Sequence, residues 1–129
     1  MKIVADTNTF LAVALDEPER RQIMAITRGH HLVAPEVLPF EVGNALTSLR
    51  RRGVLTPEQV VAAWDSVQAV AVELHRIDIR SALGIACRFG TYAYDAYFLE
   101  CALSLRLPLL TLDGGMAQLA RQLSIHVME

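Results

Sequence analysis

The hydrophobic positions along the chain follow two different patterns. Short apolar runs at residues 3–5, 31–34 and 109–112 are typical of buried strands. Between these runs lie longer segments in which apolar residues recur every three to four positions, as on an amphipathic helix. We expect helices over residues 8–15, 18–28, 37–52, 57–72, 79–89, 94–105 and 116–123, and two further short strands at 73–76 and 125–127.

Several of the expected helix ends carry a local signal. Thr56 and Gln59 match a capping box, with Pro57 in the first turn between them. Glycine follows three of the helices, at Gly29, Gly53 and Gly90, as is common at helix C-termini.

Strands that alternate with helices predict an α/β fold. We expect a central parallel sheet of about four to five short strands, flanked by about seven helices. In sheets of this kind, ligands bind beyond the carboxyl ends of the strands.

Length and composition predict one domain that spans residues 1–129. Hydrophobic residues make up 53% of the chain, which is enough for a core and for some apolar interface area. No apolar run approaches the roughly 20 residues of a membrane helix. Asp6 follows only three apolar residues, so no signal peptide is expected, and we expect a cytoplasmic protein in which Cys87 and Cys101 are reduced.

Four acidic side chains lie at the ends of apolar segments or on otherwise apolar faces, where a merely solvated charge is not expected. Asp6 ends the first strand, and Asp113 follows the strand at residues 109–112, so both are expected at the same edge of the sheet. Glu41 begins a polar helical stripe, and Asp95 stands at the head of an apolar helix face. A carboxylate beside a core must be paired, neutralised or bound to a metal. Few cations lie near these positions, so a metal-dependent enzyme is predicted.

Two of these acids also have a purely structural interpretation. Asp6 suits the N-cap of the helix that follows it, and Asp95 lies in a first helical turn, where the helix dipole favours a negative charge. A single shared site explains the positions of all four acids better than four independent coincidences do.

The overall charge gives no general nucleic-acid signal. The formal net charge is −2, and Lys2 is the sole lysine. Arginines cluster at Arg50, Arg51 and Arg52, where they suit the last turn of a helix. Contact with RNA phosphates is the alternative role for these three side chains.

Four short motifs, taken in order, resemble those of the PIN-domain ribonucleases. Their spacing covers essentially the whole chain, and its small size resembles the VapC-type toxins of toxin–antitoxin pairs. The motifs are Asp6-Thr7-Asn8, Glu41 with Asn44-Ala45-Leu46, Tyr94-Asp95-Ala96-Tyr97-Phe98, and Thr111-Leu112-Asp113.

This resemblance implies a PIN-like domain that acts as a Mg²⁺- or Mn²⁺-dependent endoribonuclease. It also implies an RNA substrate, a small VapB-like antitoxin partner and a homodimer. The acids implied as catalytic and metal-binding are Asp6, Glu41, Asp95 and Asp113, and the implied supporting residues are Thr7, Asn8, Asn44 and Thr111. Gly114 and Gly115 follow the last acid, so no fifth carboxylate is evident there, and the choice between one and two ions stays open.

The residue types suit hydrolysis of an RNA phosphodiester by a metal-activated water. Two alternatives remain at this point. One is a PIN-like domain that binds partners without catalysis. The other is a phosphatase of the haloacid dehalogenase type, although Asn8 stands where that class requires a second aspartate and no lysine lies near Asp95 or Asp113.

Overall fold

The computed structural model describes residues 1–129 and contains one parallel sheet. Its strand order is β3-β2-β1-β4, so the first strand lies in the middle and chain segments far apart in sequence become neighbours. The expected α/β class and the parallel sheet are confirmed. The strands are β1 (Lys2–Ala5), β2 (His31–Pro35), β3 (Val72–His75) and β4 (Leu109–Leu110).

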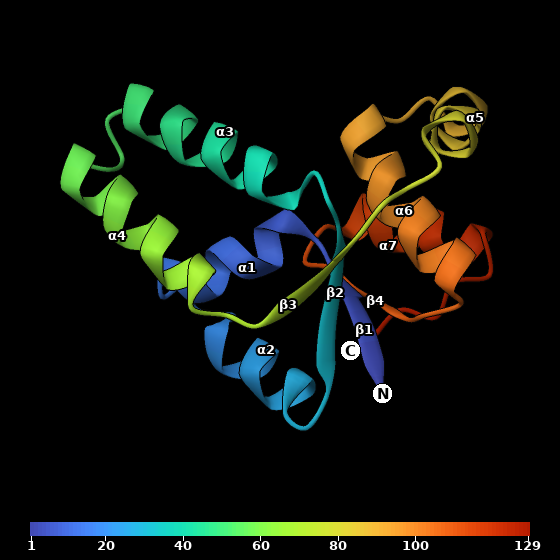
Figure 1. The fold of residues 1–129 in the computed structure, drawn as a ribbon, viewed down its shortest axis with the longest axis horizontal. Helices are drawn as coiled ribbons and strands as arrows, with labels where there is room; N and C mark the ends of the chain where they lie inside the picture. Colours follow the sequence, from blue (N-terminus) through green and yellow to red (C-terminus); the bar gives the residue numbers. More distant parts are fainter.

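Seven helices surround this sheet. In Figure 1, α3 and α4 form one arm of a V-shaped molecule, α5 and α6 form the other arm, and the sheet lies where the arms meet. Within the arms, α3 packs against α4 and α5 packs against α6. The helices are α1 (Thr7–Ala14), α2 (Arg20–Thr27), α3 (Leu38–Arg51), α4 (Pro57–Gln68), α5 (Ile79–Phe89), α6 (Ala93–Leu105) and α7 (Gly114–Gln122).

The signals at the helix ends act as expected. Thr56 caps α4, with its hydroxyl accepting from the Gln59 amide at 3.1 Å while the Gln59 side chain accepts from the Thr56 amide at 2.8 Å. Gly90 ends α5 with a φ of +66°, a left-handed conformation that glycine adopts without steric cost. Gly90 thus ends α5 shortly before α6 begins at Ala93.

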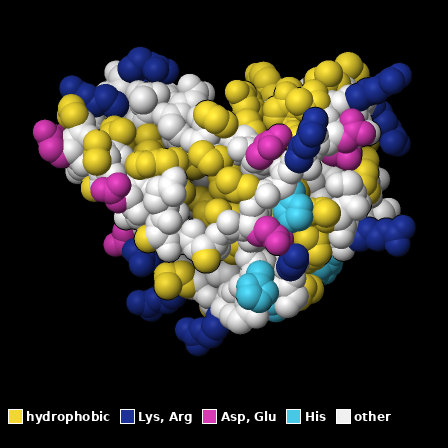
Figure 2. Space-filling view, viewed as in Figure 1, with side chains coloured by type: hydrophobic (Ala, Val, Ile, Leu, Met, Phe, Trp, Pro, Cys, Tyr) yellow, Lys and Arg dark blue, Asp and Glu magenta, His cyan; other side chains and the backbone are white.

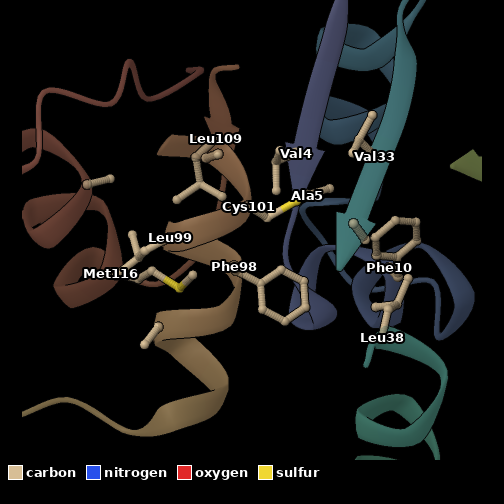
Figure 3. Close-up of a cluster of buried hydrophobic side chains, with 14 of the residues drawn as sticks. Val4, Ala5, Phe10, Val33, Leu38, Phe98, Leu99, Cys101, Leu109 and Met116 are labelled. Carbon is tan, nitrogen blue, oxygen red and sulfur yellow. The ribbon is translucent and has the colours of Figure 1, made fainter. Parts of the chain in front are cut away.

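The core lies on both faces of the central strands. Helix α6 packs on β1 and β2, and Phe98 from its inner face is only 2% exposed. Figure 3 shows Phe98 pointing from α6 toward the sheet, whereas Phe10 and Leu38 lie beside the end of β2. Burying one such side chain contributes about 1.5–3 kcal/mol. This packing holds the start of α6 and the end of β1 in fixed positions.

The structure corrects three of the expected element boundaries. The last sheet strand covers only Leu109–Leu110 instead of residues 109–112, because the Thr111 hydroxyl bonds to Asp6 and accepts from the Asp113 amide. Helix α4 ends at Gln68, since Val72 already pairs with Leu32 of β2. The strand expected at 125–127 is reduced to a single bridge between Val127 and Leu109.

None of the helices combines the length and the apolar composition that crossing a membrane requires.

Candidate metal centre

Asp6 lies at the junction of β1 and α1, where the chain leaves the sheet. Its carboxylate is nearly buried, with 5% of the residue exposed. Oδ1 accepts from the Thr9 amide at 3.1 Å and from the Thr9 hydroxyl at 2.7 Å, which makes Asp6 the N-cap of α1. The carboxylate is therefore held from inside the protein and faces the carboxyl edge of the sheet.

Thr111 connects this carboxylate to the loop that carries the last acid. Its hydroxyl donates to Asp6 Oδ2 and accepts from the Asp113 amide at 3.1 Å. Asp113 is the N-cap of α7, and its Oδ1 accepts from the Gly115 amide at 2.8 Å and from the Met116 amide at 3.2 Å. The two acids at strand ends thus share one hydrogen-bonded network.

The other two acids come from the two arms of the molecule. Glu41 is in the first turn of α3, and Asp95 is in the first turn of α6. Asp95 Oδ2 accepts from the Thr91 hydroxyl at 3.4 Å, which is a weak contact. Both residues are partly buried and lie near enough to Asp6 to feel its charge.

Glu41 has an unsatisfied buried oxygen. The Thr7 hydroxyl lies close enough to favour the charged form of Glu41. Yet Thr7 Oγ1 and Glu41 Oε2 are both buried without a hydrogen-bond partner of normal geometry. A buried polar atom without a partner costs about 1–3 kcal/mol, so a ligand or water at this point would relieve the cost.

The electrostatic environment shows that these acids act on one another. Burial raises the pKa of Asp6, Glu41 and Asp95. The negative charge of Asp113 raises the pKa of Asp6 and Asp95 further, and Asp95 and Asp6 do the same to Glu41. Hydrogen bonds from Thr111 and Thr9 oppose the shift of Asp6. None of the four ion pairs in the structure includes these acids, so no cationic side chain is paired with them.

This donor set fits a hard divalent cation. All the groups are carboxylate or hydroxyl oxygens, which Mg²⁺ and Mn²⁺ prefer over nitrogen and sulfur ligands. No group of three acidic, histidine or cysteine side chains is arranged tightly enough to enclose a bare ion. Mg²⁺ commonly keeps several waters and uses one or two carboxylates, so the looser arrangement suits it.

The asparagines and arginines that the sequence predicted for the site are all exposed to solvent. Asn8 is exposed and lines a groove beside the acids, and Asn44 is exposed with no side-chain hydrogen bond. Arg50 donates to the Leu55 carbonyl at 3.4 Å, while Arg51 and Arg52 at the end of α3 are exposed and unpaired. The roles of the two asparagines and the three arginines remain predictions.

Two threonines that contact the acids were not among the residues predicted from the sequence. Thr9 bonds to Asp6, and Thr91 bonds to Asp95. Thr9 carries a usable signal, because it lies three residues after a predicted N-cap, where its amide is expected to meet the capping carboxylate. Thr91 precedes α6 and has no periodic relation to an apolar face, so its contact depends on the turn between α5 and α6.

The geometry agrees with comparisons to known proteins. A family model described as the PIN domain matches residues 3–122, so the chain belongs to the PIN domain family. The sequence is 27% identical over 123 residues to Ribonuclease VapC3 of Pyrobaculum aerophilum, covering 92% of this chain and 94% of that protein.

A solved structure supports the same fold. The crystal structure of PAE2754 from Pyrobaculum aerophilum aligns with a TM-score of 0.67 at 19% identity, covering 96% of this chain and 98% of that one. The family expected from the order of the motifs is therefore confirmed, and the haloacid dehalogenase hypothesis is set aside.

The burial of Glu41, together with repulsion from Asp95 and Asp6, predicts how Glu41→Gln changes stability in the absence of metal. The folded protein binds the Glu41 proton more tightly than the unfolded chain, so stability falls as pH rises from the ordinary glutamate pKa through the raised pKa. Removing this charge is expected to raise Tm by about 2–5 °C at pH 8 in EDTA, and by less at pH 5. Thermal unfolding followed by circular dichroism measures the effect.

Glu58→Gln is the matched control, because Glu58 also lies in a first helical turn but is exposed on α4. It should leave Tm unchanged or slightly lower. An unchanged or lower Tm for Glu41→Gln at pH 8 would show that the cluster does not strain the folded state.

Proposed function

We propose that the protein is a Mg²⁺- or Mn²⁺-dependent endoribonuclease that hydrolyses RNA phosphodiester bonds. The observation that carries this proposal is the grouping, at the carboxyl edge of the sheet, of carboxylates that are not paired with a cationic side chain. Membership of the PIN domain family and similarity to a protein named as a ribonuclease support it. The acids in question are Asp6, Glu41, Asp95 and Asp113.

The proposed roles follow from burial and hydrogen bonding. Asp6, Asp95 and Asp113 hold the divalent ion, directly or through water. When bound, the ion lowers the pKa of a coordinated water and stabilises negative charge on the phosphate. Glu41 is a further ligand or orients the attacking water. Its buried Oε2 makes no hydrogen bond of normal geometry and its pKa is raised, so it suits acceptance of a proton from that water.

Cleavage assays on a pool of structured RNAs test this function. The wild type should cleave with Mg²⁺ or Mn²⁺ and not with EDTA. Asp6→Asn and Asp95→Asn should each lower the rate about a hundredfold or more, since each removes a charge that holds the ion. Asp65→Asn, at an exposed position on α4, is the control and should retain full activity.

Equal cleavage by the wild type and both site variants would mean that the activity is a contaminant. A folded wild type that binds RNA without cutting it would favour the non-catalytic binding domain.

A groove beside the acids suits the antitoxin partner that the family suggests. It has a volume of about 450 Å³ and lies between α1 and α3, starting at Asn8 next to the metal centre. Leu11, Leu15 and Leu49 supply an apolar wall. Glu17 and Glu19 supply two negative charges, and Arg52 supplies one positive charge. We expect an amphipathic segment of a small VapB-like antitoxin to dock here, with its apolar side chains against the leucines and basic side chains near the glutamates.

Charge reversal at Glu17 and Glu19 tests this assignment. The double variant Glu17→Arg/Glu19→Arg should cleave RNA normally but need about tenfold more antitoxin for half-inhibition, because like charges oppose docking. Titration of cleavage with a purified VapB-like antitoxin that inhibits the wild type measures this. Glu58→Arg, outside the groove, should be inhibited like the wild type. Inhibition of the double variant at wild-type concentrations would place the antitoxin elsewhere.

An apolar surface between the two arms suits a second copy of the chain. Phe40 is 77% exposed, Ile79 is 53% exposed and Tyr94 is 47% exposed, and together they border a hollow of about 420 Å³. Figure 2 shows hydrophobic side chains gathered around the hollow between the arms. Exposed apolar surface of this kind commonly marks an interface, so we place the homodimer contact here.

Phe40→Glu is expected to convert the dimer to a monomer at micromolar concentration, since it puts a charge in the centre of the proposed interface. Size-exclusion chromatography with light scattering measures the mass. Val61→Glu is the control, because Val61 is 60% exposed on α4, away from this surface. A wild type that is already monomeric at that concentration would contradict the dimer.

A further inference from the structure

Thr9 donates two hydrogen bonds to the Asp6 carboxylate, one from its amide and one from its hydroxyl. It is 2% exposed in the first turn of α1. Its hydroxyl lies 2.7 Å from Asp6 Oδ1 and 3.4 Å from the Leu110 carbonyl oxygen. A hydroxyl has one proton, and the shorter contact takes it. A buried hydroxyl is costly unless it is bonded, and valine would fill nearly the same space.

The hydrogen bonds leave Asp6 with very little free acceptor capacity. A carboxylate has about four lone-pair sites, two on each oxygen. On Oδ1, the Thr9 hydroxyl occupies one site, and the Thr9 amide, which it shares with the Asp6 backbone carbonyl oxygen at 3.1 Å, faces the other. On Oδ2, the Thr111 hydroxyl occupies one site. The single free site is therefore on Oδ2.

We propose that Thr9 is a positioning residue that saturates Oδ1 and so restricts Asp6 to binding the divalent ion, or its water, through Oδ2 alone. This inference rests on the metal-dependent function proposed above and adds a residue to it. Thr9 does not touch the ion or the RNA, and it acts only through Asp6.

The restriction has a consequence for the choice of ion. Mg²⁺ demands nearly octahedral coordination at short distances and accepts one oxygen from a carboxylate, whereas Ca²⁺ accepts more ligands and often takes both oxygens of one carboxylate. Mn²⁺ also favours an octahedral set of oxygens. Holding Oδ1 out of reach thus disfavours the larger ion. Loss of the Thr9 hydroxyl frees a lone pair on Oδ1 and lets Asp6 rotate.

Isothermal titration of the metal-free protein with Mn²⁺ and with Ca²⁺ tests the proposal in three variants. Thr9→Val removes the hydroxyl at constant size and should weaken Mn²⁺ binding about tenfold or more, as is typical when a group that orients a ligand is lost. Its Ca²⁺ affinity should fall less, so the ratio of the two affinities changes. Thr9→Ser retains the hydroxyl and should restore both affinities.

Thr27→Val is the matched control, since the Thr27 hydroxyl donates to the Ile23 carbonyl at 2.9 Å in α2 and lies outside the centre. It should bind both ions as the wild type does. If circular dichroism shows that Thr9→Val does not fold, Thr9→Ala takes its place with the same expected result.

Two outcomes would overturn the role of Thr9. One is wild-type affinity for both ions in Thr9→Val. The other is an equal loss for Mn²⁺ and Ca²⁺ that Thr9→Ser does not rescue, which would indicate a merely structural threonine. A wild type that binds Mn²⁺ no better than Asp6→Asn would instead refute the metal-dependent function itself, and Thr9 with it.

Discussion

The carboxylate of Asp6 is buried at the point where the first strand, the first helix and the last sheet strand meet. Taking a charge out of water costs several kcal/mol unless hydrogen bonds replace the water. Thr9 supplies two donors from α1, and Thr111 supplies a third from the loop after β4. These contacts end β4 early and fix the position of α1 against the sheet. The remaining acids are placed relative to this anchored group, so the geometry of the whole centre depends on it.

The acids have a structural role and a proposed chemical role at once, and the two roles support each other. Four helices begin at the centre: α1 at Asp6, α3 next to Glu41, α6 next to Asp95, and α7 at Asp113. Each helix N-terminus carries a partial positive charge, which stabilises nearby carboxylates. The fold thereby holds together groups that repel one another. Burial and the charges of the neighbouring acids still raise the pKa of Asp6, Glu41 and Asp95, so the helix ends offset the cost of these charges only in part.

The sequence was informative where local patterns decide the structure. Helices with clear apolar periodicity and strong stop signals, such as the one that Gly90 ends, lie within one or two residues of their expected bounds. Thr111 was expected inside a strand because its neighbours are apolar, yet a hydrogen bond to a residue 105 positions away takes it out of the ladder. A hydrogen bond between residues so far apart along the chain leaves no pattern in the sequence around either residue. The same reason explains why Thr91 was missed and why the burial of Glu41 Oε2 became visible only in the folded chain.

The distance along the chain between Asp6 and Thr111 also matters during synthesis. At about 5–20 residues per second, a ribosome needs roughly 5–20 s to make the 105 positions that separate them. Throughout that time Asp6 lacks one of its anchors, and Asp113 does not yet exist in the nascent chain. A product of interrupted translation that stops before this loop carries an incomplete centre. The topology thus leaves partial copies of the chain without a complete centre until nearly all of the domain has left the ribosome.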